Sequence, residues 1–207
     1  MRERDGPRGG VLPKRIILVR HGESQGNNDP ATYDTTPDPK IQLTAQGIAQ
    51  AQLAGARMRH AVAGGGSTNW RVYFYVSPYA RTRSTLREIG RSFSKKRVIG
   101  VREECRIREQ DFGNFQVQDR MNVIKEARQR FGRFFYRFPE GESAADVFDR
   151  VSSTLSLSLS LSLSFFLYRS LVLSPVAKSK LNASRRFLEL TSIFGIVRAG
   201  CICMETE

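Results

Sequence analysis

The segment Arg20–Ser24 (Arg-His-Gly-Glu-Ser) carries side chains suited to chemistry on a phosphate group. An imidazole nitrogen of His21 could attack phosphorus, and the guanidinium of Arg20 offers a rigid fork of N–H donors that matches phosphate oxygens. Gly22 lets backbone N–H groups approach the same anion. Because the segment follows the apolar run Ile16–Val19, the sequence predicts a phosphate site at the end of a buried strand.

A second arginine, Arg81, is expected at the same place from a different part of the chain. Val72–Val76 is predicted as a strand, and Ser77-Pro78 turns the chain into a helix, since proline is tolerated in a first helical turn. Arg81 lies in that turn. The carboxyl ends of parallel strands meet at one edge of a sheet, so we expect Arg81 beside His21.

The elements expected around these residues alternate between strands and helices. Periodicity and Gly/Pro breaks predict strands at residues 15–20, 72–76 and 97–101, and helices at about 44–61, 79–93, 121–136 and 143–151. Thr44 and Ser143 are the expected helix caps. This alternation predicts an α/β fold with a three-layer, mostly parallel sheet that has helices on both faces and is incomplete at its C-terminal end.

The composition changes abruptly after Val151. Leucine and serine alternate from Leu155 to Ser164. Three interpretations stand, in order of preference: a low-complexity segment, a half-buried strand, and a membrane-spanning helix within the uncharged stretch Val151–Tyr168. We expect a flexible N-terminus over residues 1–14, a partial α/β domain over 15–151 and an atypical tail over 152–207.

Size and composition narrow the classes of function. The 207 residues, 40% of them hydrophobic, suffice for one core. We interpret the net charge of +13 as a basic surface, so neither nucleic acid nor a membrane is expected as a partner. The three cysteines form neither a disulfide framework nor a zinc site. Residues 1–14 lack the apolar core of a secretory signal, which favours a cytoplasmic protein.

Several motifs follow one another in a fixed order. After Arg20–Ser24 and Asn27 come Leu43-Thr44-x-x-Gly47-x-x-Gln50-Ala51, Ser77-Pro78-x-x-Arg81-Thr82-x-x-Thr85 and Glu109-x-x-x-Gly113. Together they resemble the histidine phosphatase superfamily, in its phosphoglycerate mutase-like branch. The resemblance covers about residues 14–151, and residues 72–151 look particularly like the plant phosphoglycerate mutase-like proteins.

The resemblance implies a role for each residue of the site. His21 would be the nucleophile that accepts the phosphoryl group, and Glu109 would protonate the leaving group. The phosphoryl oxygens would be held by Arg20, Asn27 and Arg81. The implied substrate is a small phosphorylated metabolite, and the reaction would be a hydrolysis or a mutase step. No metal or other cofactor is implied, and the oligomeric state stays open.

Each role has a structural alternative. His21 could be an ordinary hydrogen-bonded histidine at a strand end, and Arg81 could be a solvated helix residue. Glu109 could belong to a structural ion pair, in which case Asp111 is the alternative acid. Asn27 could merely shape its loop.

Two further segments are expected to wall the site and set its specificity. They are the loop Gly26–Lys40 and the helix over residues 121–136. Aromatic residues in and after this helix fit the spacing of a buried face, so we interpret them as core packing and not as a base-stacking surface: Phe131, Phe134, Phe135 and Phe138.

The chain departs from the family pattern at one point. Family members carry a second catalytic histidine at the end of a central strand, well after the Gly-Glu-Ser segment, here Gly141–Ser143. The other histidine of this chain is His60, expected on the surface four turns beyond Thr44. The missing imidazole predicts impaired phosphoryl transfer. A missing strand would leave an uncovered edge unless Leu171–Leu173 or Ile193–Val197 substitutes for it.

Competing hypotheses therefore come from different classes. The leading one is an impaired enzyme of this superfamily, and the second is a pseudoenzyme that binds phosphorylated ligands through Arg20 and Arg81 without turnover. A basic RNA-binding module ranks below both. We further hypothesise that the tail arises from a retained intron or a shifted reading frame after about Ser153, so that the C-terminal part of the domain is replaced or truncated.

Overall fold

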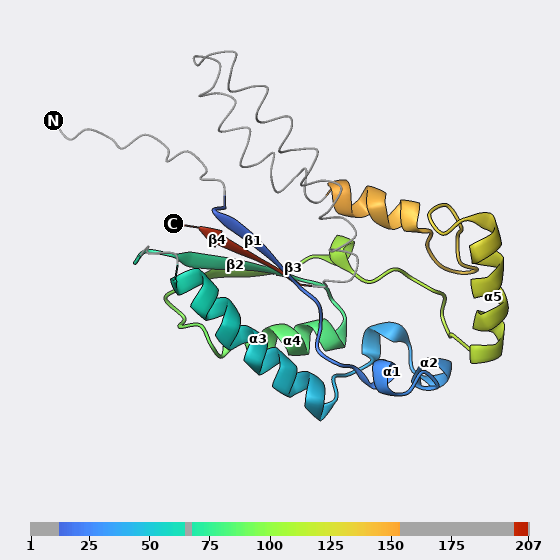
Figure 1. The fold of residues 1–207 in the computed structure, drawn as a ribbon, viewed down its shortest axis with the longest axis horizontal. Coiled ribbons are helices and arrows are strands. Elements are labelled where there is room, and N and C mark those ends of the chain that lie inside the picture. Colours follow the sequence, from blue (N-terminus) through green and yellow to red (C-terminus); the bar gives the residue numbers. More distant parts are fainter. Residues whose placement is uncertain (1–12, 65–67, 154–200, 207) are drawn as a thin grey trace, which may run out of the picture.

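Four strands form the sheet in the computed structural model, which describes residues 13–64, 68–153 and 201–206. In the order in which they lie side by side, the strands are β1 (Arg15–Val19), β4 (Cys201–Thr206), β2 (Arg71–Val76) and β3 (Val98–Glu103) (Figure 1). β2 and β3 are parallel, and β4 is antiparallel to both of its neighbours. Three strands therefore share one direction, which confirms the predicted mostly parallel sheet.

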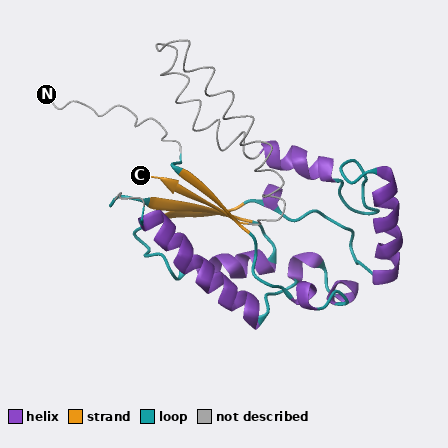
Figure 2. Cartoon of the chain, in the orientation of Figure 1, coloured by secondary structure: helices purple, strands orange, loops and turns teal. Residues whose placement is uncertain are grey.

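Helices and short helical turns connect these strands (Figure 2). After β1 come α1 (Gln25–Asn28), α2 (Thr32–Thr35), the 3-10 turn η1 (Asp38–Lys40) and α3 (Ala45–Ala63). After β2 comes α4 (Ala80–Gly90), and after β3 come the 3-10 turn η2 (Cys105–Ile107), α5 (Gln118–Phe131) and a further helix over residues 144–153.

The two predicted caps are confirmed. Thr44 Oγ1 accepts the N–H of Gly47 at 3.1 Å at the start of α3. Ser143 Oγ accepts the N–H of Asp146 at 3.1 Å, and the Asp146 carboxylate accepts the Ser143 N–H at 2.7 Å. These two helices thus begin where a side-chain oxygen satisfies an otherwise unpaired backbone donor.

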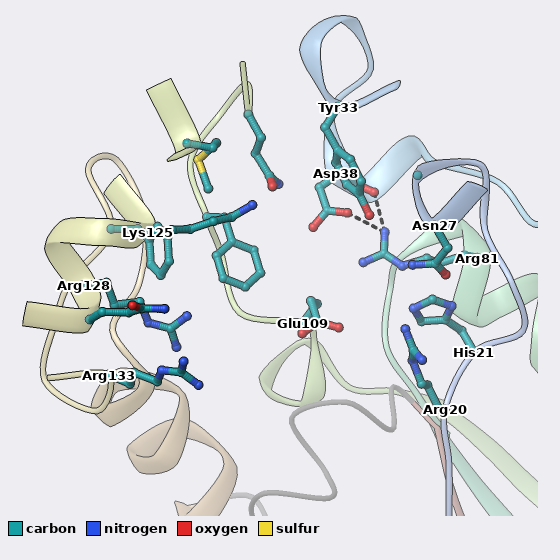
Figure 3. A pocket seen from close by; sticks show the side chains of 16 residues that line it. Arg20, His21, Asn27, Tyr33, Asp38, Arg81, Glu109, Lys125, Arg128 and Arg133 are labelled. Atoms are coloured by element: carbon teal, nitrogen blue, oxygen red, sulfur yellow. Dashed lines mark hydrogen bonds and ion pairs between the residues drawn. The ribbon is translucent and has the colours of Figure 1, made fainter. Parts of the chain in front are cut away.

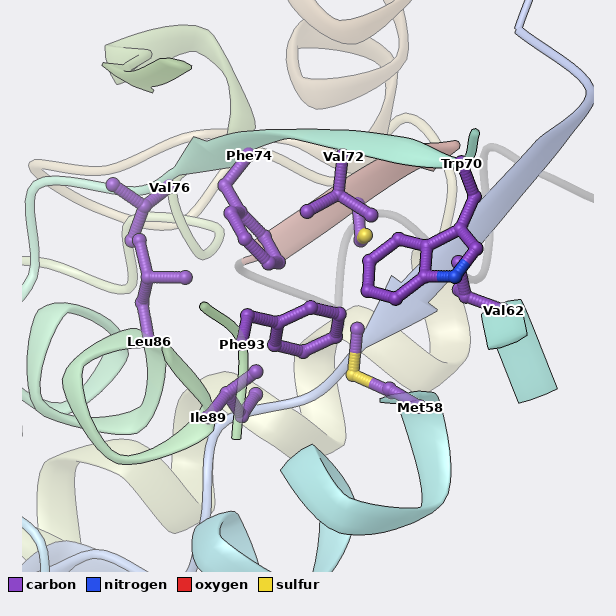
Figure 4. Packing of buried hydrophobic residues seen from close by; sticks show 10 residues of the cluster. Met58, Val62, Trp70, Val72, Phe74, Val76, Leu86, Ile89 and Phe93 are labelled. Carbon is purple, nitrogen blue, oxygen red and sulfur yellow. The ribbon is translucent and has the colours of Figure 1, made fainter. Parts of the chain in front are cut away.

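Both faces of the sheet are covered, as a three-layer fold requires. On one face, alternate residues of β2 pack with α3 and α4 around the rings of Trp70 and Phe93 (Figure 4). On the other face, Leu18 and Tyr75 pack against a smaller cluster made by Ile107 and the helix over residues 144–153. The period of two along β1 and β2 is what divides their side chains between these layers.

The centre of the sheet differs from the sequence expectation. β4 lies between β1 and β2, with Cys203 opposite Ile17 and Phe74, and the Cys203 side chain is fully buried. This is the central position at which a missing strand was predicted from the sequence. The two segments expected to substitute, Leu171–Leu173 and Ile193–Val197, lie outside the described residues.

The helix predicted over residues 121–136 is shorter at its end and longer at its start. α5 ends at Phe131 because Gly132 adopts a positive φ of 111°, which breaks the helical path. The prediction of an aromatic buried face was wrong for most of its members. Phe131 and Phe135 are 68% and 72% exposed, whereas Phe138 is buried.

Within the described ranges, none of the helices is both long and apolar enough to cross a membrane. The serine-leucine alternation, for which a spanning helix was the least preferred interpretation, lies outside those ranges.

Candidate active site

A pocket of about 640 Å³ lies beyond the carboxyl end of β1. All five residues predicted for the site line it: Arg20, His21, Asn27, Arg81 and Glu109. They come from the loop after β1, from the first turn of α4 and from the segment after η2, and Figure 3 shows them converging on one cavity. The structure therefore brings together residues that are nearly 90 positions apart in the sequence.

His21 is held in a single orientation by its own neighbour. Its Nδ1 lies 2.6 Å from the carbonyl oxygen of Gly22, so Nδ1 carries the proton and donates it. The pKa of His21 is lowered to about 4, mainly by burial and also by the charges of Arg81 and Arg20, against the opposing effect of this hydrogen bond. Near neutral pH the ring is uncharged, and Nε2 carries a free lone pair.

The loop that carries His21 is pressed against the start of α3. A Cβ atom on Gly22 would lie 2.3 Å from the carbonyl oxygen of Gly47, and one on Gly47 would lie 2.0 Å from that of Glu23. Only glycine permits backbones to approach this closely. The two glycines thus let the loop and the helix start meet.

Hydrogen bonds then fix the same loop to α3 and α4. Thr44 Oγ1 donates to the Glu23 carboxylate at 2.7 Å, and Gln50 Oε1 accepts the Glu23 N–H at 2.9 Å. Thr85 Oγ1 accepts the Gly22 N–H at 3.1 Å and donates to the carbonyl oxygen of Arg81 at 2.8 Å. These four polar motif residues therefore position the loop and do not line the pocket: Glu23, Thr44, Gln50 and Thr85.

Arg81 lies in the first turn of α4 and is almost completely buried, with 3% of its side chain exposed. Its Nη1 donates to the Asp38 carboxylate at 2.5 Å and to the Asp38 carbonyl oxygen at 2.8 Å. Its guanidinium stacks over Tyr79, and its Nε is buried with no hydrogen-bond partner among the described residues. The solvated alternative for Arg81 is therefore wrong, and a partner that the sequence did not suggest is Asp38.

Asn27 both shapes its loop and faces the pocket. Its Oδ1 accepts the N–H of Ser24 at 3.1 Å, while Ser24 Oγ accepts the N–H of Asn27 in return. This reciprocal cap uses the amide oxygen, so the NH₂ group is the part of Asn27 that can donate to an anion.

Glu109 lies between the two walls of the cavity (Figure 3). Burial raises the pKa of its carboxyl group, partly offset by the positive charge of Arg81 and reinforced by Asp38. Asp111, the alternative acid, does not line the cavity, and its carboxylate instead accepts the N–H of Gly113 at 2.9 Å. The geometry favours Glu109 over Asp111 as a proton donor.

The segment that carries Glu109 is anchored by Glu142. The Glu142 carboxylate accepts hydrogen bonds from Arg108 and, at 2.8 and 3.0 Å, from Arg150. Arg150 also donates to the carbonyl oxygen of Glu109 at 3.2 Å. The Gly-Glu-Ser segment thus has a local role, which is to hold the acid-bearing loop against the helix over residues 144–153.

The second histidine of the chain is not part of the site. His60 is exposed near the end of α3 and does not line the pocket, as predicted. Among the residues that the structure describes, no group of three or more His, Cys, Asp or Glu side chains could hold a metal ion.

Most side chains in the predicted walls of the site were not identified from the sequence. The loop at residues 26–40 and the helix over residues 121–136 were predicted as walls, but of their side chains only Asn27 was predicted to line the site. The structure adds Tyr33 and Asp38 from the loop, and Met121, Lys125, Arg128, Gln129 and Arg133 from the helix and the turn after it. Four residues along α5 follow one another at spacings of four, three and one: Met121, Lys125, Arg128 and Gln129. This spacing places them on one helical face and was the signal available in the sequence.

The chain belongs to the histidine phosphatase superfamily (branch 1), whose family model matches residues 16–161. It is 75% identical over 146 residues to the phosphoglycerate mutase-like protein AT74 of Arabidopsis thaliana, a match that covers 70% of this chain and 46% of AT74. The related Arabidopsis protein AT74H is 71% identical over 149 residues, with 70% and 53% covered. The chain thus spans about half the length of these relatives.

Solved structures agree on the fold. A protein of Mycobacterium tuberculosis, the product of open reading frame Rv3214, has a TM-score of 0.50 and 25% identity, with 71% of this chain and 68% of the other covered. A mycobacterial glucosyl-3-phosphoglycerate phosphatase, solved with inorganic phosphate, has a TM-score of 0.51 at 18% identity, with 70% and 63% covered. At that identity the second likeness speaks for the fold alone.

Proposed function

We propose that this chain accepts the phosphoryl group of small phosphomonoesters on His21 and releases it to water or to a second acceptor. Arg20, Asn27 and Arg81 would hold the phosphoryl oxygens, and Glu109 would serve as the acid. Membership of the superfamily supports phosphatase or mutase chemistry in general. The names of the relatives, two phosphoglycerate mutase-like proteins and a broad-range acid phosphatase of yeast that is 28% identical, are consistent with either reaction.

The observation that carries the proposal is the state of the His21 ring. A nucleophilic imidazole must be uncharged and must aim a lone pair at phosphorus. The Nδ1 hydrogen bond to Gly22 and the low pKa of the ring meet the first requirement and leave Nε2 available. The raised pKa of Glu109 meets the complementary need for a protonated acid in the same cavity.

The proposed reaction has two steps. In the first, His21 Nε2 forms a bond to phosphorus, the bond from phosphorus to the ester oxygen breaks, and the Glu109 carboxyl gives its proton to that oxygen. In the second, water attacks phosphorus, the N–P bond breaks, and Glu109 takes the proton from the water. The cations offset charge on the phosphoryl oxygens in both steps.

The absence of a second histidine in the pocket lowers the expected rate. With His21 and His60 the only histidines of the chain, the pocket holds one imidazole. Removing one group that stabilises charge in a transition state typically costs about 10²- to 10³-fold in rate. We therefore propose a slow enzyme, in which the phosphohistidine is the product easiest to detect.

The proposal is tested by labelling. The purified full chain is incubated with a ³²P-labelled phosphomonoester, and acid-labile, alkali-stable label is counted. We expect label in the unchanged protein and in His60→Ala, and none in His21→Ala. Equal labelling of both variants would contradict the role of His21.

The second candidate is a binding protein without turnover. The observation in its favour is that Arg20 and Arg81 line the pocket without a second imidazole beside them. It predicts that inorganic phosphate binds, that Arg81→Gln abolishes this binding, and that no acid-labile label forms. Binding without label would establish this function in place of catalysis.

A further inference from the structure

The wall of the pocket opposite His21 carries its own group of cations. Lys125 and Arg128 lie on one face of α5, and Arg133 follows the turn at Gly132. Figure 3 shows these three side chains across the cavity from His21. Together they form what we call the distal cluster, defined as Lys125, Arg128 and Arg133.

The charges of the distal cluster are not neutralised by carboxylates among the described residues. Several arginines nearby but outside the pocket do have carboxylate partners: Arg120 pairs with Glu140, Arg137 with Asp146, and Arg108 and Arg150 with Glu142. Within residues 13–64, 68–153 and 201–206, no member of the distal cluster makes an ion pair. The three cations of the distal cluster thus differ from Arg81 in the same cavity, which is paired with Asp38.

Arg128 gives the clearest indication that this wall of the cavity can bind an anion. Its guanidinium lies over the ring of Phe138, with 5.2 Å from Cζ to the ring centroid. Its Nε is buried and has no hydrogen-bond partner among the described residues. Burial and the charge of Arg133 lower its pKa. A buried donor without an acceptor is costly, and an anion in the cavity would satisfy it.

The space between the arginines beside His21 and the distal cluster can hold the organic part of a substrate. The cavity of about 640 Å³ falls in the range that encloses whole metabolites. Phe112 and Phe138 line it, and their rings pack edge to face with the ring centroids 4.8 Å apart. The cavity therefore offers apolar surface in addition to its cations.

We propose that the pocket takes a two-headed substrate, in which a phosphomonoester lies at His21 and a second anionic group, phosphate or carboxylate, lies at the distal cluster. This rests on the proposed function only in assigning the reacting phosphate to the His21 end. The distal cluster sets substrate choice and does not take part in phosphoryl transfer.

Binding constants for matched sugar phosphates test the proposal. Calorimetry on the full chain compares fructose 6-phosphate, which has one anionic group, with fructose 1,6-bisphosphate and with 6-phosphogluconate, whose second group is a carboxylate. We expect at least one two-headed ligand to bind about 10-fold more tightly than fructose 6-phosphate. The better of the two identifies the second group.

Variants of α5 supply the control. Lys125→Gln and Arg128→Gln are expected to remove most of this preference, because they should weaken binding of the two-headed ligands more than binding of fructose 6-phosphate. Arg130→Gln, which removes the same charge from an exposed position of the same helix outside the pocket, is expected to keep it. Lys125 is exposed, so its variant remains informative if Arg128→Gln unfolds.

Two results would overturn the inference. One is equal affinity of the unchanged protein for one-headed and two-headed ligands. The other is an equal loss in Lys125→Gln and Arg130→Gln, which would indicate a general charge effect. Neither depends on the labelling of His21, so failure of the proposed chemistry and failure of this inference are told apart.

Discussion

Nη1 of Arg81 donates to the carboxylate of Asp38 in the cavity that both residues line. The 2.5 Å contact joins side chains that are 3% and 11% exposed, so water screens it little. In the proposed function, a phosphate bound by Arg81 would share this guanidinium with Asp38 or displace the Asp38 carboxylate.

Replacing Asp38 should consequently tighten phosphate binding. Asp38→Asn keeps the shape of the side chain and removes its charge, which frees a fork of Arg81 for the ligand. We expect the dissociation constant of inorganic phosphate to fall about 10-fold, measured by calorimetry. Asp29→Asn, in the same loop but outside the pocket, should leave it unchanged. An unaltered constant in Asp38→Asn would show that the ion pair does not compete.

The rate of phosphoryl transfer should follow a bell-shaped dependence on pH. His21 must be uncharged, so kcat/KM should rise as the pH passes about 4. The proton on Glu109 is lost at a pKa above its ordinary value, so the rate should fall beyond that point. Profiles are compared for glycerol 3-phosphate and p-nitrophenyl phosphate, whose leaving group needs no proton.

The variant Glu109→Gln distinguishes the contribution of Glu109 to this pH profile from that of His21. It should lower kcat/KM for glycerol 3-phosphate by about 10²- to 10⁴-fold and change kcat/KM for p-nitrophenyl phosphate little, because kcat/KM reports the step that forms the phosphohistidine. The rise near pH 4 should persist in the variant. Equal losses for both substrates would argue against Glu109 as the acid.

The buried His21 ring should also make stability depend on pH. Its pKa is about 4 in the folded chain, below the ordinary 6.5, so the unfolded chain binds more protons between these values. The associated stability is present above about pH 6.5 and is lost as the pH falls toward 4, amounting to about 2 to 3 kcal/mol. Urea unfolding at pH 7 and pH 4.5 should show a smaller loss in His21→Asn than in the unchanged protein or in His60→Asn.

The contact between the His21 loop and α3 should tolerate no side chain at Gly47. The Cβ of Gly47→Ala would collide with the Glu23 carbonyl oxygen, at a cost of about 3 kcal/mol, and would shift the loop enough to abolish labelling. Gly90 gives the matched control, because a Cβ there meets no atom within 4 Å. Gly90→Ala should stabilise α4 by about 0.5 to 1 kcal/mol in urea unfolding and keep the label.

Local signals explain which parts of this fold could be predicted. The starts of β1, α3 and the helix over residues 144–153 depend on neighbours in the chain: an apolar run, or a capping oxygen such as those of Thr44 and Ser143. The five site residues could be predicted because they belong to motifs. The early end of α5 was not predicted, although Gly132 interrupts the pattern in the sequence.

Other features depend on contacts between segments that are distant in the sequence, and no local sequence pattern predicts them. The loop between α1 and α3 carries Asp38 to Arg81, 43 positions away. The apolar run of β4 has no feature that assigns it to the centre of the sheet rather than to an edge. The exposed rings of Phe131 and Phe135 were misjudged because apolar spacing indicates a face, not whether another layer covers it.

The position of β4 makes the sheet depend on a pairing between segments that are far apart in the chain. Arg15 of β1 pairs with Glu205 of β4, 190 positions away. Before β4 is in place, β1 lacks its neighbour in the described sheet and β2 is paired only with β3. Pairings this distant in sequence form slowly, and open strand edges attract other chains. The facing edges of β1 and β2 are therefore exposed to aggregation until β4 inserts between them.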